Sequence, residues 1–155
     1  MEKINIRKAT INDLNSVQYL NNSLFDLELN NFDDTLKQGW FFEKEGKEYF
    51  KDMINNEIVF VAQIEEKIVG YLAGSICEQT SYITETFAEL DNMCINEEYR
   101  RFGIGTLLMN EFKKYCKEKD MQNIKVTASA KNSRAIQFYI KNGFEAYNVT
   151  LKYKI

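Results

Sequence analysis

The chain has 155 residues, of which 45% are hydrophobic and 14% aromatic, and its formal net charge is −3. This length and composition predict one folded domain over residues 1–155 and argue against a disordered chain. No strongly basic tract indicates a nucleic-acid partner. No apolar run approaches the roughly 18 residues of a membrane-spanning helix, so we expect no membrane partner.

The sequence has three cysteines and no histidine. Cys77, Cys94 and Cys116 lie far apart and lack CxxC spacing. The first ten residues are charged throughout and do not form a signal peptide, so we expect reduced thiols in a cytoplasmic protein. The lack of histidine excludes His-containing triads, His general bases and His-ligated zinc, and we expect no metal site.

The first part of the chain predicts a strand followed by helices. Apolar and polar residues alternate at the start, which is typical of a short strand. Thr10 is a good N-cap, and Asp13 places a carboxylate in the first helical turn. The predicted elements are a strand at Ile4–Lys8, a helix from Thr10 to about Leu20, helical stretches at Ser23–Leu29 and Lys47–Asn55, and an irregular segment at Phe32–Lys44 that contains Trp40-Phe41-Phe42.

From Ile58 onward, the hydrophobic pattern becomes mainly that of strands, with two helices among them. Glu65-Glu66 separates two apolar runs and indicates a hairpin, and Gly143 is placed as the C′ residue of the last helix. The predicted elements are strands at Ile58–Ile64, Lys67–Ile76, Phe87–Ile95, Ile124–Ser129 and Phe144–Tyr153, and helices at Ile104–Lys119 and Ser133–Asn142. This is an α/β layout with a mixed sheet.

The most informative segment is Asn96–Leu108, with the sequence NEEYRRFGIGTLL. A strand ends, Gly103 and Gly105 allow the backbone to approach a bulky anion, and an amphipathic helix begins at once. The helix N-terminus offers free amides and the positive end of its dipole, and two arginines add charge. The segment therefore predicts a diphosphate site. It lacks the P-loop pattern, and Leu108 leaves the dinucleotide fingerprint GxGxxG incomplete, which disfavours a nucleotide-binding α/β domain.

This half of the chain contains two motifs. Arg100, Gly103 and Gly105 fill the first, [QR]-x-x-G-x-[GA]. The second, an Asn followed by Ala, Tyr and Gly-Phe, is matched by Asn132, Ala135, Tyr139 and Gly143-Phe144. In their order and separation, the two motifs resemble those of the Gcn5-related N-acetyltransferases. The resemblance extends from about Ile58 to the C-terminus, and more weakly over the preceding strand and helices.

The resemblance implies a mixed central sheet flanked by helices, in which two parallel strands splay apart and hold acetyl-CoA. The splayed strands would be Phe87–Ile95 and Ile124–Ser129, and the pantetheine arm would pair with strand backbone as an added strand does. The implied cofactor-binding residues are Met93, Cys94, Ile95, Arg100, Arg101, Phe102, Gly103, Ile104, Gly105, Thr106, Asn132 and Tyr139. Core packing of Met93 and Ile95 is compatible with this role, since the contacts use their backbone.

The resemblance also implies catalytic residues. Glu89 would take the proton of the acceptor amine, and Asp91, two residues along the strand, would share that role or bind the amine. The competing interpretation places one or both carboxylates at a hydrated sheet end. Tyr139 would protonate the leaving coenzyme A thiolate, or pack as a core aromatic. Cys94 is interpreted as a small strand residue, because without histidine it has no activating base for a covalent route.

The implied function is transfer of an acetyl group directly from acetyl-CoA to an amine of a small molecule, peptide or protein. The alternative is a non-catalytic acyl-CoA sensor of the same fold. We expect the acceptor site in Asn21–Phe50 and Glu78–Thr86, where an acidic, aromatic stretch suits a cationic amine or forms a solvated helix face. This stretch contains Phe25, Asp26, Glu28, Phe32, Asp33 and Asp34. Trp40-Phe41-Phe42 would line the acceptor cleft, pack on the sheet or contact a partner in a homodimer, and the sequence leaves the oligomeric state open.

Overall fold

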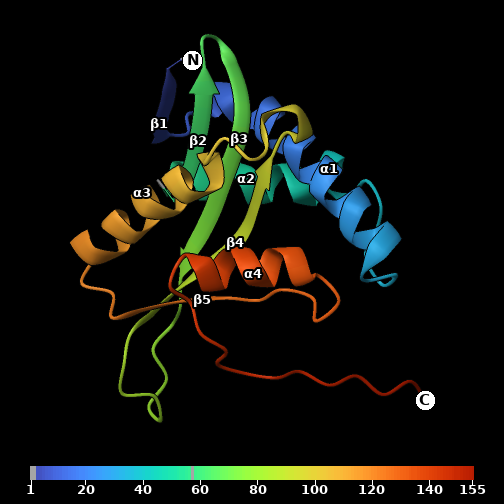
Figure 1. The fold of residues 1–155 in the computed structure, drawn as a ribbon, viewed down its shortest axis with the longest axis vertical. Helices are drawn as coiled ribbons and strands as arrows, with labels where there is room; N and C mark the ends of the chain where they lie inside the picture. Colours follow the sequence, from blue (N-terminus) through green and yellow to red (C-terminus); the bar gives the residue numbers. More distant parts are fainter. Residues whose placement is uncertain (1–2, 57) are drawn as a thin grey trace.

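A computed structural model describes residues 3–56 and 58–155 as a five-stranded sheet with helices on both faces (Figure 1). Residues 1 and 2, the start of the segment compared with a signal peptide, lie outside the described residues. The strands are β1 (Ile4–Lys8), β2 (Val59–Ile64), β3 (Lys67–Ile76), β4 (Phe87–Ile95) and β5 (Asn123–Val126). The α-helices are α1 (Leu14–Asn31), α2 (Lys44–Asn55), α3 (Ile104–Glu118) and α4 (Ser133–Lys141).

The strands lie in the order β1-β2-β3-β4-β5, so each strand pairs with its neighbours in sequence. The first four are antiparallel, whereas β4 and β5 are parallel. A parallel pair needs a crossover, and α3 supplies it. The sheet is therefore mixed, as expected, and its one parallel pair is the pair that the resemblance assigns to the cofactor.

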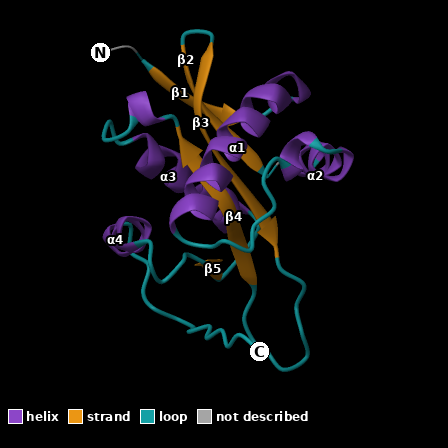
Figure 2. Ribbon diagram, turned by 90° about the vertical axis from the view of Figure 1, so that its right-hand side faces the viewer, coloured by secondary structure: helices purple, strands orange, loops and turns teal. Residues whose placement is uncertain are grey.

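Two apolar cores lie on opposite faces of the sheet. Figure 2 shows α3 on one side of the sheet and α1 and α2 on the other. On one face, α3 packs Leu108 and Phe112 onto Phe60 and Leu72 of the sheet. On the other face, α1 and α2 pack residues such as Phe50 onto the alternate strand residues. Because β3 and β4 are covered on both faces, their backbone is held rigidly where the predicted site begins.

The structure joins the two predicted N-terminal helices into one, α1, so the predicted interruption near Asn21 is wrong. Asn21 is fully buried, and its side-chain amide donates to the hydroxyl of Tyr71 on β3. A tertiary hydrogen bond thus holds a residue of low helix propensity inside the helix. Thr10 caps the short 3-10 turn Ile11–Asp13 that leads into α1, and Asp13 Oδ2 accepts from the Thr10 backbone N–H at 2.7 Å. The α-helix itself begins later than predicted, at Leu14 with Asp13 as its N-cap.

Phe41, in the irregular segment before α2, is buried among the aromatic rings of the second core. Its ring centroid lies 4.3 Å from that of Phe25 and 5.4 Å from that of Phe50. Trp40 packs beside it, whereas Phe42 is about half exposed. Three interpretations of Trp40-Phe41-Phe42 were open, and Phe41 agrees with the one in which the cluster packs against the sheet.

The end of the chain departs most from expectation. The predicted strand Phe144–Tyr153 is wrong, because no residue from Phe144 onward belongs to a strand. Strand β5 also ends at Val126 rather than Ser129. A strand needs a neighbour for its backbone hydrogen bonds, and the described residues after Phe144 make no backbone hydrogen bond to the sheet. The segment touches the sheet through a side chain, since the Tyr147 ring stacks on Phe87 of β4. Among the described residues, none after Cys116 is buried.

Candidate functional site

Six successive backbone amides stand unpaired between β4 and α3. The N–H groups of Arg101 to Thr106 donate to no acceptor among residues 3–56 and 58–155. Arg101 and Gly103 both adopt left-handed backbone conformations, with φ of 70° and 78°, which turns the chain into the first turn of α3. Amides concentrated at a helix N-terminus form a site for an anionic group. The geometry therefore fits a diphosphate where the sequence predicted one.

Arg100 fastens this loop to the end of β4. Its Nε donates to the carbonyl oxygen of Ile95 at 3.0 Å. Arg101 and Phe102 are exposed beside it, so their side chains remain open to solvent at the edge of the loop. One arginine thus holds the backbone in place, while the next is available to an anion.

Strands β4 and β5 separate beside this loop. Their pairing runs from Phe87↔Asn123 to Leu90↔Val126 and then stops, whereas β4 continues to Ile95 paired with β3 alone. The β5-facing backbone of Asp91–Ile95, which includes Met93 and Cys94, is therefore a free strand edge. Such an edge accepts an extended ligand with amide groups as an added strand. The predicted splay thus appears in the strand register.

A β-bulge at Asp91 marks the point of separation. Ala73 pairs with Asn92 and Gly74 with Leu90, so Asp91 has no partner on β3. The extra residue shifts the alternation of β4: Leu90 and Met93, three residues apart, both pack with the α3 core. The period-two argument from the sequence did not include this bulge.

The bulge places Asp91 and Glu89 differently. Glu89 lies within the paired part of β4, opposite Lys125, and its Oε2 is 3.4 Å from Lys125 Nζ. Asp91 lies just beyond the last pair and accepts a hydrogen bond from Ser75 Oγ at 3.2 Å. Partial burial, and then the negative charge of Glu89, raise the pKa of Asp91 above its usual value, although the Ser75 hydrogen bond opposes them.

Helix α4 brings Asn132 and Tyr139 to the same region. Asn132 Oδ1 accepts from the Ala135 backbone N–H at 3.1 Å, so the predicted N-cap is confirmed. Burial, followed by the charge of Glu28, raises the pKa of Tyr139 to about 12. The hydroxyl is thus protonated at neutral pH and can donate a proton or hydrogen bond.

Glu28 joins the site from α1, a contact that sequence reasoning missed. Its Oε1 accepts from Asn132 Nδ2 at 3.4 Å, which links the C-terminal part of α1 to the start of α4. Burial is the main cause of the raised pKa of Glu28. In the sequence, Glu28 was one acidic residue among several, and only the heptad-like spacing of α1 with Asn21 could have shown which of them faces inward.

Gly105 has a second reason to lack a side chain. A Cβ at this position would lie 3.1 Å from Cζ of Phe138 and 3.9 Å from Cε of Met93. The glycine therefore lets α4 pack closely on the first turn of α3. Gly103 differs, because a Cβ there would meet nothing within 4 Å, so the space beside it is open.

The cysteines are unsuited to nucleophilic chemistry. Burial raises the pKa of the Cys94 thiol to about 11, although Arg100 lowers it somewhat. Burial also raises the pKa of Cys116 to about 11. Both thiols stay protonated near neutral pH, and the thiolate is the reactive form. This agrees with the interpretation of Cys94 as a small residue of the strand.

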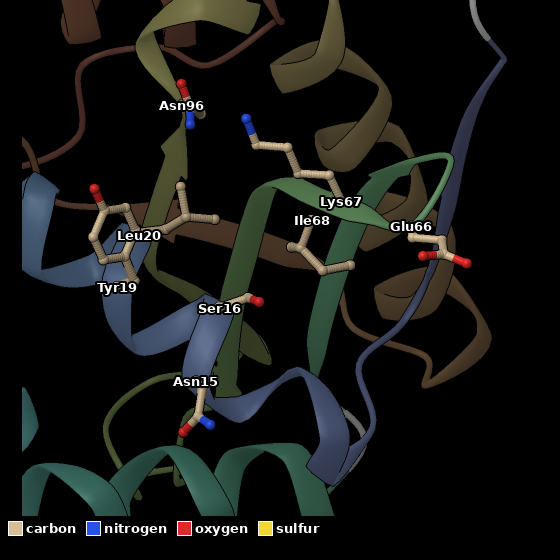
Figure 3. A pocket seen from close by; sticks show the side chains of 8 residues that line it. All are labelled: Asn15, Ser16, Tyr19, Leu20, Glu66, Lys67, Ile68 and Asn96. Atoms are coloured by element: carbon tan, nitrogen blue, oxygen red, sulfur yellow. The ribbon is translucent and has the colours of Figure 1, made fainter.

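A hollow of about 560 Å³ lies on another part of the surface, between the start of α1 and the β2–β3 turn (Figure 3). Its lining includes Tyr19 and Leu20 of α1, Lys67 and Ile68 of β3, and Asn96. It is open to solvent and holds none of the predicted catalytic groups. Within the described ranges, no helix has the length and apolar character to cross a membrane, and no three His, Cys, Asp or Glu side chains gather as metal ligands.

Two relatives match in sequence. An N-acetyltransferase of Methanocaldococcus jannaschii is 31% identical over 104 residues, which are 65% of this chain and 46% of that protein. An N-alpha-acetyltransferase of Sulfurisphaera tokodaii is 29% identical over 121 residues, 74% of this chain and 68% of that protein. The chain thus matches about half the length of the first relative.

Solved structures share the fold. The BH1408 protein of Bacillus halodurans, as a tetramutant, superposes with a TM-score of 0.87 at 22% identity, over 97% of this chain and 99% of that one. The aminoglycoside N-acetyltransferase AAC(6')-Iy in complex with CoA has a TM-score of 0.78 at 13% identity, over 100% and 96% of the two chains. The acetyltransferase (GNAT) family model matches residues 21–144, which include the unpaired amides, the splay and α4. This chain therefore belongs to the acetyltransferase (GNAT) family.

Proposed function

We propose that the protein transfers an acetyl group from acetyl-CoA to an amine. The observation that carries the proposal is the run of unpaired amides from Arg101 to Thr106 beside the free edge of β4. A diphosphate and an amide-bearing arm are the two parts of coenzyme A that these features fit. Family membership and the CoA complex of the structurally similar aminoglycoside N-acetyltransferase support it.

The splay sets the order of the groups along the ligand. The diphosphate would lie on the amides at the start of α3, and the arm would run along Ile95, Cys94 and Met93 toward the bulge. The thioester would then reach the level of Asp91, where β4 and β5 begin to pair. Acetyl-CoA supplies the activated acyl group, and the protein's own residues orient it and move protons.

The reaction we propose is a direct transfer. The ammonium form of the acceptor first gives up one proton, because only the neutral amine nitrogen can attack the thioester carbonyl carbon. After the attack the carbon–sulfur bond breaks, the thiolate gains a proton, and the nitrogen loses its second proton to solvent. The proton that leaves before the attack is the one that needs a base. Asp91 is the preferred acceptor of that proton, because it lies at the separation of the strands and its pKa is raised toward neutrality. Glu89, paired with Lys125, raises that pKa and is the second candidate. Tyr139 donates a proton to the leaving sulfur, since its hydroxyl is protonated near neutral pH.

The acceptor we propose is a cationic amine. Glu28 lies next to Asn132 at the start of α4, and Asp26, Asp33 and Asp34 lie on the same stretch of chain as Glu28. Negative charge at the mouth of a site raises the local concentration of cations. Structurally similar proteins include aminoglycoside acetyltransferases, one of them 25% identical to this chain. A small-molecule amine and a peptide N-terminus both carry a positive charge when they are protonated.

The test is release of free thiol from acetyl-CoA in the presence of separate acceptors: an aminoglycoside, a polyamine, an amino acid and a peptide with a free N-terminus. We expect release with at least one amine, loss of release in Tyr139→Phe, and acetylated amine detected by mass. Binding of acetyl-CoA without transfer to any amine would instead identify a sensor. No binding of acetyl-CoA would refute both.

A further inference from the structure

A chain of polar side chains links α1, β3, β4 and α2 on the face of the sheet opposite α3. Asn21 of α1 donates to the hydroxyl of Tyr71 on β3. That hydroxyl donates to Asn92 Oδ1 on β4 at 2.6 Å, and Asn21 Nδ2 lies 3.2 Å from the same oxygen. Asn92 Nδ2 then donates to the hydroxyl of Tyr49 on α2 at 3.4 Å. The chain therefore leads from the buried core to one tyrosine beside the bulged part of β4.

The direction of these hydrogen bonds makes Tyr49 a donor. Asn92 Oδ1 accepts from Tyr71 and Asn21, so the amide group of Asn92 directs its Nδ2 toward Tyr49. The Tyr49 oxygen thus accepts, and its O–H donates to no acceptor in the described part of the chain. Burial, and then the charge of Asp91, raise the pKa of Tyr49 to about 12, although the Asn92 hydrogen bond opposes them. The hydroxyl therefore keeps its proton at neutral pH.

This donor lies on the same face of the sheet as the proposed proton acceptor. Ser75 follows Tyr71 by four residues on β3, so alternation places both on the face covered by α1 and α2. Asp91 accepts from Ser75 Oγ at 3.2 Å, and Asn92 accepts from Tyr71. The two adjacent residues of the bulge therefore both face α2, from which the Tyr49 hydroxyl approaches. A ligand between α2 and β4 would meet a carboxylate and an O–H donor at neighbouring positions.

Stability alone does not account for this network. Asn21 Oδ1 is buried and has no hydrogen-bond partner among the described residues. A buried polar atom without a partner destabilises a fold, and apolar side chains of similar size would avoid that loss. The network instead orients Tyr49, whose ring centroid lies 5.0 Å from that of Phe50 and 5.9 Å from that of Trp40. Packing thus fixes the ring, and Asn92 fixes the hydroxyl.

We propose that the Tyr49 hydroxyl binds an oxygen atom of the acceptor, and that the acceptor is an amine with an oxygen on the neighbouring carbon. This inference rests on the proposed transfer to an amine and narrows its substrate. With the nitrogen at Asp91, an oxygen one carbon away lies within reach of the adjacent Tyr49 O–H. An amino sugar has a hydroxyl at that place and a peptide N-terminus has a carbonyl, whereas an alkyl polyamine has no oxygen. Asn92, Tyr71 and Asn21 are positioning residues that act through Tyr49.

The test uses two pairs of amines that differ in this oxygen: glucosamine with cyclohexylamine, and alaninamide with isopropylamine. In a thiol-release assay, Tyr49→Phe should raise the KM of glucosamine, of alaninamide or of both about tenfold, the loss of roughly one hydrogen bond, and leave kcat unchanged. The oxygen-free amines should inhibit the wild type and Tyr49→Phe equally. Tyr19→Phe removes the hydroxyl of an exposed tyrosine of α1 and should change nothing. The pair that responds distinguishes an amino sugar from a peptide N-terminus.

A second variant tests the positioning network. Asn92→Leu keeps the Tyr49 hydroxyl but removes the group that orients it, so it should raise the same KM, and its combination with Tyr49→Phe should add little. Additive losses would overturn the role of the network, and circular dichroism checks that each variant is folded. An unchanged KM in Tyr49→Phe would overturn the inference and leave the proposed function in place. So would an equal weakening of the oxygen-free amines, or transfer to a polyamine with neither glucosamine nor alaninamide accepted. Absence of transfer to every amine would refute the proposed function, and this inference with it.

Discussion

Replacement of Gly103 by valine separates backbone strain from ligand binding, because the chain offers a matched control at Gly39. The two glycines have φ of 78° and 73°, and at neither would a Cβ meet an atom within 4 Å. Each precedes a helical turn, but only Gly103 lies among the unpaired amides. The two substitutions therefore impose nearly the same conformational strain at places with different proposed roles.

We expect each valine to cost on the order of 1–3 kcal/mol of folding free energy, since a β-branched residue rarely adopts positive φ. In a chain of this length, 1 kcal/mol lowers Tm by roughly 2–4 °C. Gly103→Val should in addition weaken coenzyme A binding by tenfold or more, about 1.4 kcal/mol, because its side chain fills the space that a diphosphate needs. Gly39→Val should bind coenzyme A as the wild type does.

Thermal unfolding measures the first effect and calorimetric titration the second. If Gly103→Val and the wild type bind coenzyme A with equal affinity, the diphosphate does not bind at this loop. An equal loss of affinity in both variants would show that strain alone disturbs binding, and the amides would then have no special role.

Three further substitutions test individual side chains. Tyr139→Phe should lower kcat by on the order of 10²-fold and leave coenzyme A affinity unchanged, since a proton to the leaving sulfur acts only in the transition state; wild-type turnover would make Tyr139 a packing aromatic. Asp91→Asn should abolish the rise of kcat with pH, whereas Glu89→Gln should move that rise to lower pH by removing a like charge; intact profiles in both would leave proton removal to water. Asp13→Asn should cost on the order of 2 kcal/mol at pH 7, because Asp13 receives two hydrogen bonds from Arg7, at 2.7 and 2.9 Å. The Arg7 guanidinium is the largest cause of the lowered pKa of Asp13, so the stabilisation is complete above the ordinary pKa of 3.8 and is lost as the pH falls through the lower pKa of the folded protein. In urea unfolding, the difference in unfolding free energy between the wild type and Asp13→Asn should be smaller at pH 3 than at pH 7. An equal difference at both pH values would contradict this reasoning.

Local features of the site could be predicted from the sequence. Gly103, Gly105 and the helix after them form one continuous segment, and their conformations follow from residue type and from the start of an amphipathic helix. Asn132 is likewise recognisable as an N-cap. Such features depend on neighbours a few residues away, so a single sequence contains them.

Other features depend on contacts between distant parts of the chain, and the sequence did not reveal them. The bulge at Asp91 arises from the register of β4 against β3, which no local pattern specifies. The contact of Glu28 with Asn132 joins residues 104 apart. The uninterrupted α1 depends on Tyr71, which receives the amide of the buried Asn21. In each case a residue far away in the sequence determines the local structure, and local secondary-structure propensity does not.

The lack of buried residues after Cys116 has a consequence for how the protein unfolds. Helix α4 and strand β5 contribute half of the splay, yet the core belongs to the chain before them. We expect these two elements to open as one unit at a free energy below that of global unfolding, and their amides to exchange with solvent first. A ligand between β4 and β5 would have to hold that unit closed, and saturation at 100 times its dissociation constant would add about 2.7 kcal/mol to the opening free energy. Proteolytic susceptibility of the last quarter of the chain would then report occupancy of the site.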